Sequence, residues 1–184
     1  MTTAVPGFST PGAGPEAPLE MLVVCHDRVA RQCATLRRLV SHMGVHGANA
    51  QARDAALSVM RYFDSSAIDH HQDEEVNLFP ALIDAMAGSD AVCLHRLIDD
   101  LTSEHRTLET LWQRLRITLV SIAAGESVLL KGEEVEALVV LYERHIRCEE
   151  TELLPMATRL LSEAALTEMG RAMRLRRGIG DNLL

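Results

Sequence analysis

The sequence predicts an all-α fold: an up-down-up-down four-helix bundle with a short extra C-terminal helix. Aromatic residues make up only 3% of the chain, and Gly and Pro become sparse after residue 15, a composition typical of helices. Apolar residues also recur at intervals of three and four along several long stretches. The 184 residues are enough to bury one core without disulfides, so we expect a single main domain.

The first half of the chain divides into a tail and two helical stretches. Residues 1–15 are rich in Pro, Gly, Ser and Thr without an apolar period, so we expect a flexible tail there. The bundle is predicted to occupy residues 16–161. Its first helix should run from about 16 to 45 and end at Gly44 and Gly47. A second stretch should begin near residue 49 and break near Asp64-Ser65-Ser66, which offers N-cap chemistry.

The second half adds two long helices and a short one. After a turn at residues 88–90, one amphipathic helix is predicted over 91–124 and another over 133–161. Residues 162–184 are predicted to form a short helix, capped by Ser162, and a tail. The arginines near the end of this helix are expected to complement its dipole; they are Arg171, Arg174, Arg176 and Arg177.

An internal repeat is the most informative feature of the sequence. HHQDEEVNLFP at 70–80 aligns without gaps to HIRCEETELLP at 145–155, and both copies place a His four residues before a Glu. On an α-helix this spacing brings the two side chains within roughly 40° of one another at a rise of about 6 Å, so both lean over one spot. The pairs are His70 with Glu74 and His145 with Glu149.

Each copy is preceded by an isolated His at a similar distance. His26 lies 44 residues before His70, and His105 lies 40 residues before His145. In antiparallel helices joined by a short turn, residues equally far from the turn lie at the same height. Buried imidazoles and carboxylates at this density need a compensating charge, which favours a metal. We therefore predict two metal ions bridged by two carboxylates, held by His26, His70, Glu74, His105, His145 and Glu149.

Imidazole and carboxylate donors without thiolates favour non-haem iron over manganese or zinc. At this point the sequence resembles the hemerythrin-like, or HHE cation-binding, family over about residues 18–161. The resemblance rests on the order H, HxxxE, H, HxxxE and on the flanking EEVNLFP. It implies a four-helix bundle, two irons held by the six residues above, and activities from dioxygen binding to redox sensing and iron-centre repair. We expect an oxo or hydroxo bridge between the irons.

Departures from the oxygen carriers place the ligand set nearer to bacterial HHE proteins and iron-centre repair proteins. Oxygen carriers place a second His four residues from the one on the third helix, whereas Leu101 and Glu109 flank His105 at that spacing. The internal repeat favours Glu149 over Glu150 as a ligand. Whether Glu109, Glu150 or His71 joins the site stays open, with His71 expected to support a ligand or lie at the surface.

The leading functional prediction is binding or sensing of a small ligand such as O2, NO or H2O2. Apolar residues are expected to line its pocket, and no general acid or base stands out, so the sequence leaves enzymatic activity undecided. The alternatives are an iron-centre repair or nitric-oxide or peroxide detoxifying catalyst, and a metal-free helical interaction module. The predicted lining residues are Leu22, Leu78, Leu108 and Trp112.

Charge and cysteine usage restrict the partners and the compartment. A net charge of -8 disfavours binding to nucleic acid. No stretch reaches the roughly 18 apolar residues that a membrane helix needs, so no membrane association is expected. The cysteines form no C-x-x-C pair, which indicates reduced thiols and a cytoplasmic protein; they are Cys25, Cys33, Cys93 and Cys148.

Overall fold

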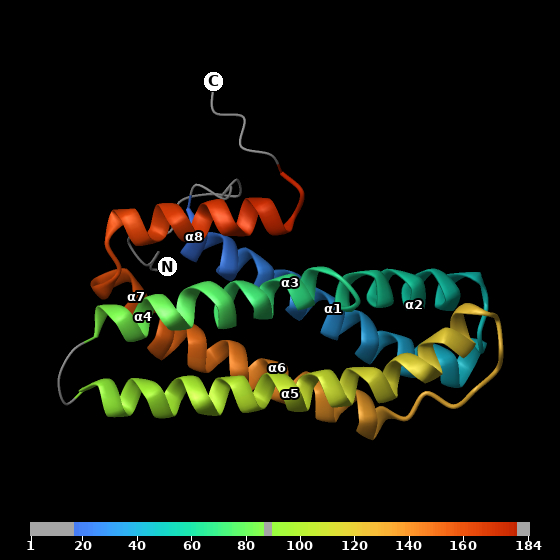
Figure 1. Ribbon diagram of the computed structural model, residues 1–184. Helices are drawn as coiled ribbons and strands as arrows, with labels where there is room; N and C mark the ends of the chain where they lie inside the picture. Colours follow the sequence, from blue (N-terminus) through green and yellow to red (C-terminus); the bar gives the residue numbers. More distant parts are fainter. Residues whose placement is uncertain (1–16, 87–89, 180–184) are drawn as a thin grey trace, which may run out of the picture.

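The computed structural model describes residues 17–86 and 90–179 and shows a four-helix bundle with an additional helix on its outside (Figure 1). The predicted N-terminal tail, most of the 88–90 turn and the last five residues lie outside the described residues. Two of the bundle helices are continuous and two are assembled from shorter pieces. In chain order the elements are α1 (Pro18–His46), α2 (Ala50–Phe63), α3 (Ser66–Asp73), η1 (Glu74–Leu78), α4 (Phe79–Ala85), α5 (Asp90–Ala123), α6 (Gly132–Cys148), η2 (Glu149–Leu153), α7 (Leu154–Leu160) and α8 (Glu163–Arg176).

The helices pack in the order that an up-down-up-down bundle requires. Helix α1 contacts α2 and α6, and α5 contacts the same two helices, so α1 and α5 lie diagonally across the core. Helix α8 lies outside this arrangement, against α1 and α3 (Figure 1). The predicted all-α class and topology are confirmed. Among the described residues, no helix combines the length and apolar character needed to cross a bilayer.

Helix ends agree with the predicted positions but not always with the predicted chemistry. Helix α1 ends at Gly47, whose φ of 62° favours glycine, while Gly44 lies inside the helix. Ser162 caps α8 by accepting a hydrogen bond from the Ala165 N–H, as predicted. The break between α2 and α3 is also present, but Ser65 caps nothing. Its hydroxyl donates instead to the carbonyl of Arg61.

Each repeat contains a π-helical turn, η1 or η2, directly before the helical segment that carries Pro80 or Pro155. Proline lacks an N–H and its ring clashes with the carbonyl four residues earlier. In both repeats the preceding turn widens, so that Phe79 and Leu154 donate to carbonyls five residues earlier, those of Glu74 and Glu149. The helices continue through both prolines to residues 85 and 160. Such wider turns often mark functional positions, and here they begin at the two repeat glutamates.

The buried core is divided into two apolar clusters. One lies toward the α1–α2 connection and contains Phe63, Trp112 and Leu138, among others. The other lies toward α4, α7 and α8 and includes Leu22, Leu78 and Leu101. On every bundle helix, a buried His stands between a residue of the first cluster and a residue of the second. A polar layer therefore separates the two halves of the core.

Candidate metal centre

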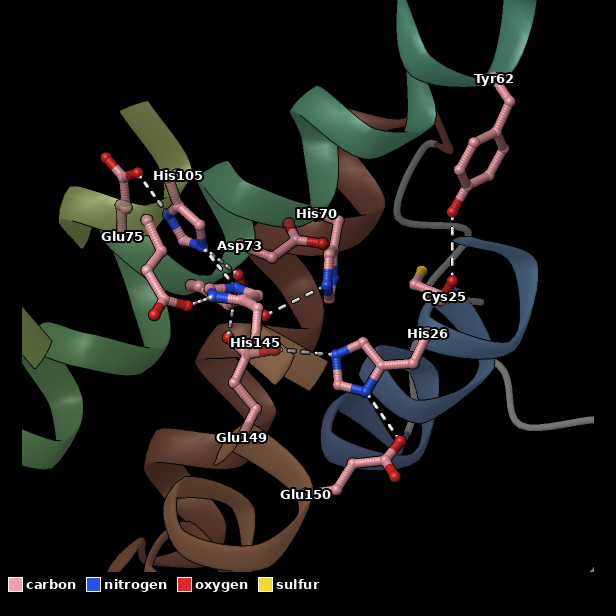
Figure 2. Close-up of polar contacts among 12 residues, drawn as sticks. Cys25, His26, Tyr62, His70, Asp73, Glu75, His105, His145, Glu149 and Glu150 are labelled. Carbon is pink, nitrogen blue, oxygen red and sulfur yellow. Dashed lines mark hydrogen bonds and ion pairs between the residues drawn. The ribbon is translucent and has the colours of Figure 1, made fainter. Parts of the chain in front are cut away.

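Six nearly fully buried side chains meet in the layer between the two apolar clusters (Figure 2). Each bundle helix contributes one imidazole, and the first residues of η1 and η2 contribute the carboxylates. None of the six is more than 2% exposed. They are His26, His70, Glu74, His105, His145 and Glu149, the residues that the sequence singled out.

These residues form two overlapping sets of four, and within each set one ligand atom from every residue lies within 4.8 Å of the others. Glu74 and Glu149 belong to both sets. His26 and His70 complete one set, and His105 and His145 complete the other, which is the pairing of helices that the sequence predicted. Two shared carboxylates with two imidazoles at either end match what a pair of bridged cations requires.

Several of these atoms form no hydrogen bond in the described part of the chain, although imidazole nitrogens and carboxylate oxygens lie within 3.3 Å of one another. Nε2 of His26 lies 3.1 Å from Oε2 of Glu149, but the two atoms do not meet the geometry of a hydrogen bond. Both carboxylate oxygens of Glu149 and Oε2 of Glu74 are buried without a hydrogen-bond partner. Burying carboxylate oxygens without hydrogen bonds costs roughly several kcal/mol each unless a charge compensates for the lost water. The residues therefore fit a pair of bound cations.

The outer ring nitrogens of three imidazoles are held by carboxylates. Nδ1 of His26 lies 2.9 Å from Oε1 of Glu150, and Nδ1 of His105 lies 2.7 Å from Oε1 of Glu75 (Figure 2). Nδ1 of His145 lies 3.0 Å from Oε2 of Glu104. A carboxylate that accepts from Nδ1–H fixes the ring and leaves the Nε2 lone pair free for a metal.

The charges in the cluster are unequal when no cation is bound. Burial favours the neutral form of His26, but Glu149 and Glu150 outweigh it and raise the pKa of His26 to about 10. Burial and the charge of Glu149 raise the pKa of Glu74 well above its ordinary value. Burial would also raise the pKa of Glu149, yet His145 and His26 hold it well below the usual range. Protons on His26 and Glu74 therefore offset part of the negative charge that bound cations would otherwise balance.

The model of the hemerythrin HHE cation-binding domain family matches residues 17–157, a range that contains all six residues of the cluster. The chain belongs to the hemerythrin HHE cation-binding family. A curated protein of Haemophilus influenzae, described as an uncharacterized protein, is 32% identical over 164 residues. That alignment covers 89% of this chain and 92% of the relative.

The six buried residues of the cluster, here called the HHE centre, match between the two halves of the bundle. The side chains around them do not all match. Glu104, which supports His145, precedes His105, but the position before His26 is Cys25. His70 consequently has no matching carboxylate, and its Nδ1 is buried without a hydrogen-bond partner among the described residues. The repeat contains a signal for two of the supporting carboxylates, because Glu75 and Glu150 match in it, but neither was predicted in this role. Nothing in the repeat indicated Glu104.

For three residues near the centre, the sequence does not decide whether they bind a metal, and the structure describes where each of them lies. Glu150 supports His26 from outside both donor sets, and Glu109 is exposed and pairs with Arg106. His71 is 7% exposed, which rules out the surface position considered for it. Four apolar residues were predicted to line the ligand pocket. Leu108 and Trp112 do line a cavity, whereas Leu22 and Leu78 pack in the apolar cluster near α8.

The arginines near the end of α8 also differ from the prediction. Asp73, next to Glu74, is fully buried and forms ion pairs with both Arg176 and Arg177. Arg176 also donates to the side-chain oxygen of Asn77 at 3.0 Å. These two arginines therefore neutralise a buried carboxylate of the bundle instead of serving only the helix dipole. They fasten α8 over the α3 side of the HHE centre.

Proposed function

We propose that the protein holds two irons at this centre and binds or senses a small diatomic or peroxide ligand such as O2, NO or H2O2. The single observation that carries the proposal is the pair of four-residue donor sets that share Glu74 and Glu149. Six donors exceed the four ligands of one tetrahedral zinc site. Imidazole and carboxylate ligands also suit iron better than they suit metals that prefer thiolate ligands. Manganese or zinc is the less favoured occupant.

When bound, the two irons and their oxo or hydroxo bridge would supply an open coordination position for the incoming ligand. The protein's contribution is to hold the donors in place. Glu150, Glu75 and Glu104 fix three of the imidazole rings through Nδ1, and the apolar clusters on both sides limit access of water. We identify no proton-transfer residue among the ligands' supports, so binding or sensing is favoured over turnover.

The proposed location is the cytoplasm, and nucleic acid is not a proposed partner. The first is supported by the four cysteines, which are free thiols: Cys25, Cys33, Cys93 and Cys148. The second is supported by the net charge of -8, which repels phosphate backbones.

Anaerobic reconstitution with ferrous iron tests the proposed function. We expect about two irons per chain, as the two donor sets indicate, and new near-ultraviolet absorption when air is admitted. A spectrum that reverts when oxygen is removed would support binding. Steady consumption of nitric oxide or peroxide, or iron transfer to an apo iron-sulfur protein, would instead establish the detoxifying or repair activity. Binding of less than half an iron, unchanged in a His70→Ala, Glu149→Ala variant, would leave a metal-free helical module.

A further inference from the structure

A cavity of about 670 Å³ lies beside the HHE centre, between the α2–α3 segment and α5. Its lining includes the apolar side chains of Phe63, Leu108 and Trp112 and the polar side chains of His71 and Glu75. Glu75 is the carboxylate that holds Nδ1 of His105. The cavity thus reaches the residues that surround the His105 and His145 end of the centre.

His71 carries an unpaired nitrogen at this place. Its Nε2 is buried and has no hydrogen-bond partner among the described residues. One of its ring nitrogens also lies within 4.8 Å of donor atoms of both His105 and His145. An unpaired polar atom in a core is costly, so a residue kept in this state is expected to have a partner that arrives from outside.

The orientation of its ring argues against His71 as a further ligand of the same ion. The rings of His71 and His105 are stacked, with centroids 3.9 Å apart and an angle of 11° between their planes. An imidazole binds a metal through a lone pair that lies in the ring plane. Two stacked, nearly parallel planes cannot both contain the ion, so His71 stands beside the coordination sphere. In the second repeat its position is taken by Ile146.

At the opposite end, Nδ1 of His70 also has no hydrogen-bond partner among the described residues, but His70 is a proposed ligand and lines neither cavity. There α8 is fastened over α3 by the ion pairs of Asp73. A second cavity, of about 570 Å³, is lined by Leu19, Val23, Leu154 and Glu150, among others. It reaches Glu150, which already accepts from His26, but its lining contains no unpaired imidazole. The two ends of a duplicated scaffold therefore differ in what they present to a ligand.

We propose that the small ligand enters through the cavity beside α5 and that His71 donates a hydrogen bond from Nε2–H to it at the His105 and His145 end. This inference rests on the proposed function and deepens it, because it assigns the ligand to one end of the centre. A small ligand with a polar or partly negative atom facing His71, such as nitric oxide or dioxygen, is the class that this donor fits. His71 acts as a positioning residue.

Substitution of His71 tests the hydrogen bond. Reduced, iron-loaded His71→Leu should bind nitric oxide about tenfold more weakly, the loss expected for one buried hydrogen bond to a polarised atom. His71→Gln, which retains an N–H donor at similar reach, should recover most of the affinity. His95→Leu, which changes an exposed histidine on α5, serves as the matched control and should bind as the wild type does.

The outcomes separate the inference from the proposed function. If wild-type protein binds no iron, both are wrong. If all variants hold two irons but His71→Leu binds nitric oxide as tightly as wild type, the proposed function stands and the hydrogen bond is refuted. If His71→Leu instead loses one of two irons, His71 is a ligand, which also refutes the inference.

Three exposed threonines provide a test of the entry route. Thr110 lines the cavity beside α5, Thr158 lines the second cavity, and Thr107 lines neither. Each donates its hydroxyl to the carbonyl four residues earlier, so the three sites are closely matched. Thr110→Trp should slow nitric oxide association several-fold in a stopped-flow measurement while iron content is unchanged. Slowing by Thr158→Trp alone, or equally by all three, would overturn the assigned route.

Discussion

Oε1 of Glu75 lies 2.7 Å from Nδ1 of His105, and this contact ties the carboxylate next to one shared glutamate to an imidazole on another helix. The second repeat forms the equivalent contact, 2.9 Å, between Glu150 and His26. Each repeat thus supplies one carboxylate to the centre and uses the following one to orient a His of the other helix pair. The two repeats are interlocked by these contacts.

Removal of either supporting carboxylate should weaken one end of the centre. Glu75→Gln should lower iron affinity at the His105 end by about 10- to 100-fold, the loss typical of such supports, because the ring is no longer fixed and the ligand is less basic. Glu150→Gln should do the same at the His26 end. Equilibrium iron titration in a competing chelator measures both. Glu109→Gln, an exposed carboxylate one turn beyond His105, is the control; equal loss in all three variants would contradict the assignment.

The buried carboxylate of Asp73 should make α8 essential for stability. An Arg176→Leu, Arg177→Leu double variant leaves that carboxylate without its cationic partners, so we expect it to lower the free energy of unfolding by about 3 kcal/mol. Denaturant titration measures the change. Adding Asp73→Asn to the double variant should restore a large part of the loss, because the unpaired charge is then absent. Arg171→Leu, at an exposed site on the same helix, should change stability by less than about 0.5 kcal/mol.

The buried carboxyl groups that are proposed to bind metal should lower the stability of the metal-free protein. Glu74 is 1% exposed, and its Oε2 has no hydrogen-bond partner in the described part of the chain. Glu74→Gln removes an ionisable group from the core, so the metal-free variant should be more stable than wild type by about 1 kcal/mol. The variant should also bind less iron. Thermal unfolding with and without added ferrous iron checks both parts, with the exposed Glu152→Gln as control. If the metal-free Glu74→Gln protein is less stable than the wild type, Glu74 does not destabilise the metal-free protein.

Stability should fall at alkaline pH through the thiol of Cys33. Burial raises the pKa of this group from 9.0 to about 12. Between these values the unfolded chain loses the proton and the folded chain keeps it. Stability from this group is therefore intact below pH 9.0 and decreases as pH rises toward about 12, by up to about 1.4 kcal/mol per pH unit.

Comparison of Cys33→Ala with wild type isolates this effect, because other buried groups titrate in the same range. The variant should lose stability at every pH from the cavity it creates, but its slope above pH 9.0 should be shallower. Cys93→Ala removes an exposed thiol and should leave the slope unchanged. Identical slopes in Cys33→Ala and wild type would exclude Cys33 as the source.

The sequence by itself determined the helical class, the bundle topology and the six residues that meet in the core. It did so because helical periodicity, spacing of four and an internal repeat are local properties of the chain, and antiparallel packing converts equal distances from a turn into equal heights. His26 and His70 could be paired, and Glu74 matched to Glu149, before any contact was known. The repeat also contained the signal for Glu75 and Glu150.

Only the tertiary structure decided what surrounds those residues. Glu104 reaches His145 from a different helix, and Arg177 reaches Asp73 across 104 positions of sequence, so no local pattern indicates either contact. The stacking of His71 on His105 likewise depends on how two helices are rotated against each other. Side-chain neighbours across helices follow from packing, which a period of three or four residues constrains to a face of the helix and no further. The six residues that meet in this buried cluster could therefore be predicted from the sequence, but the asymmetry of their surroundings could not.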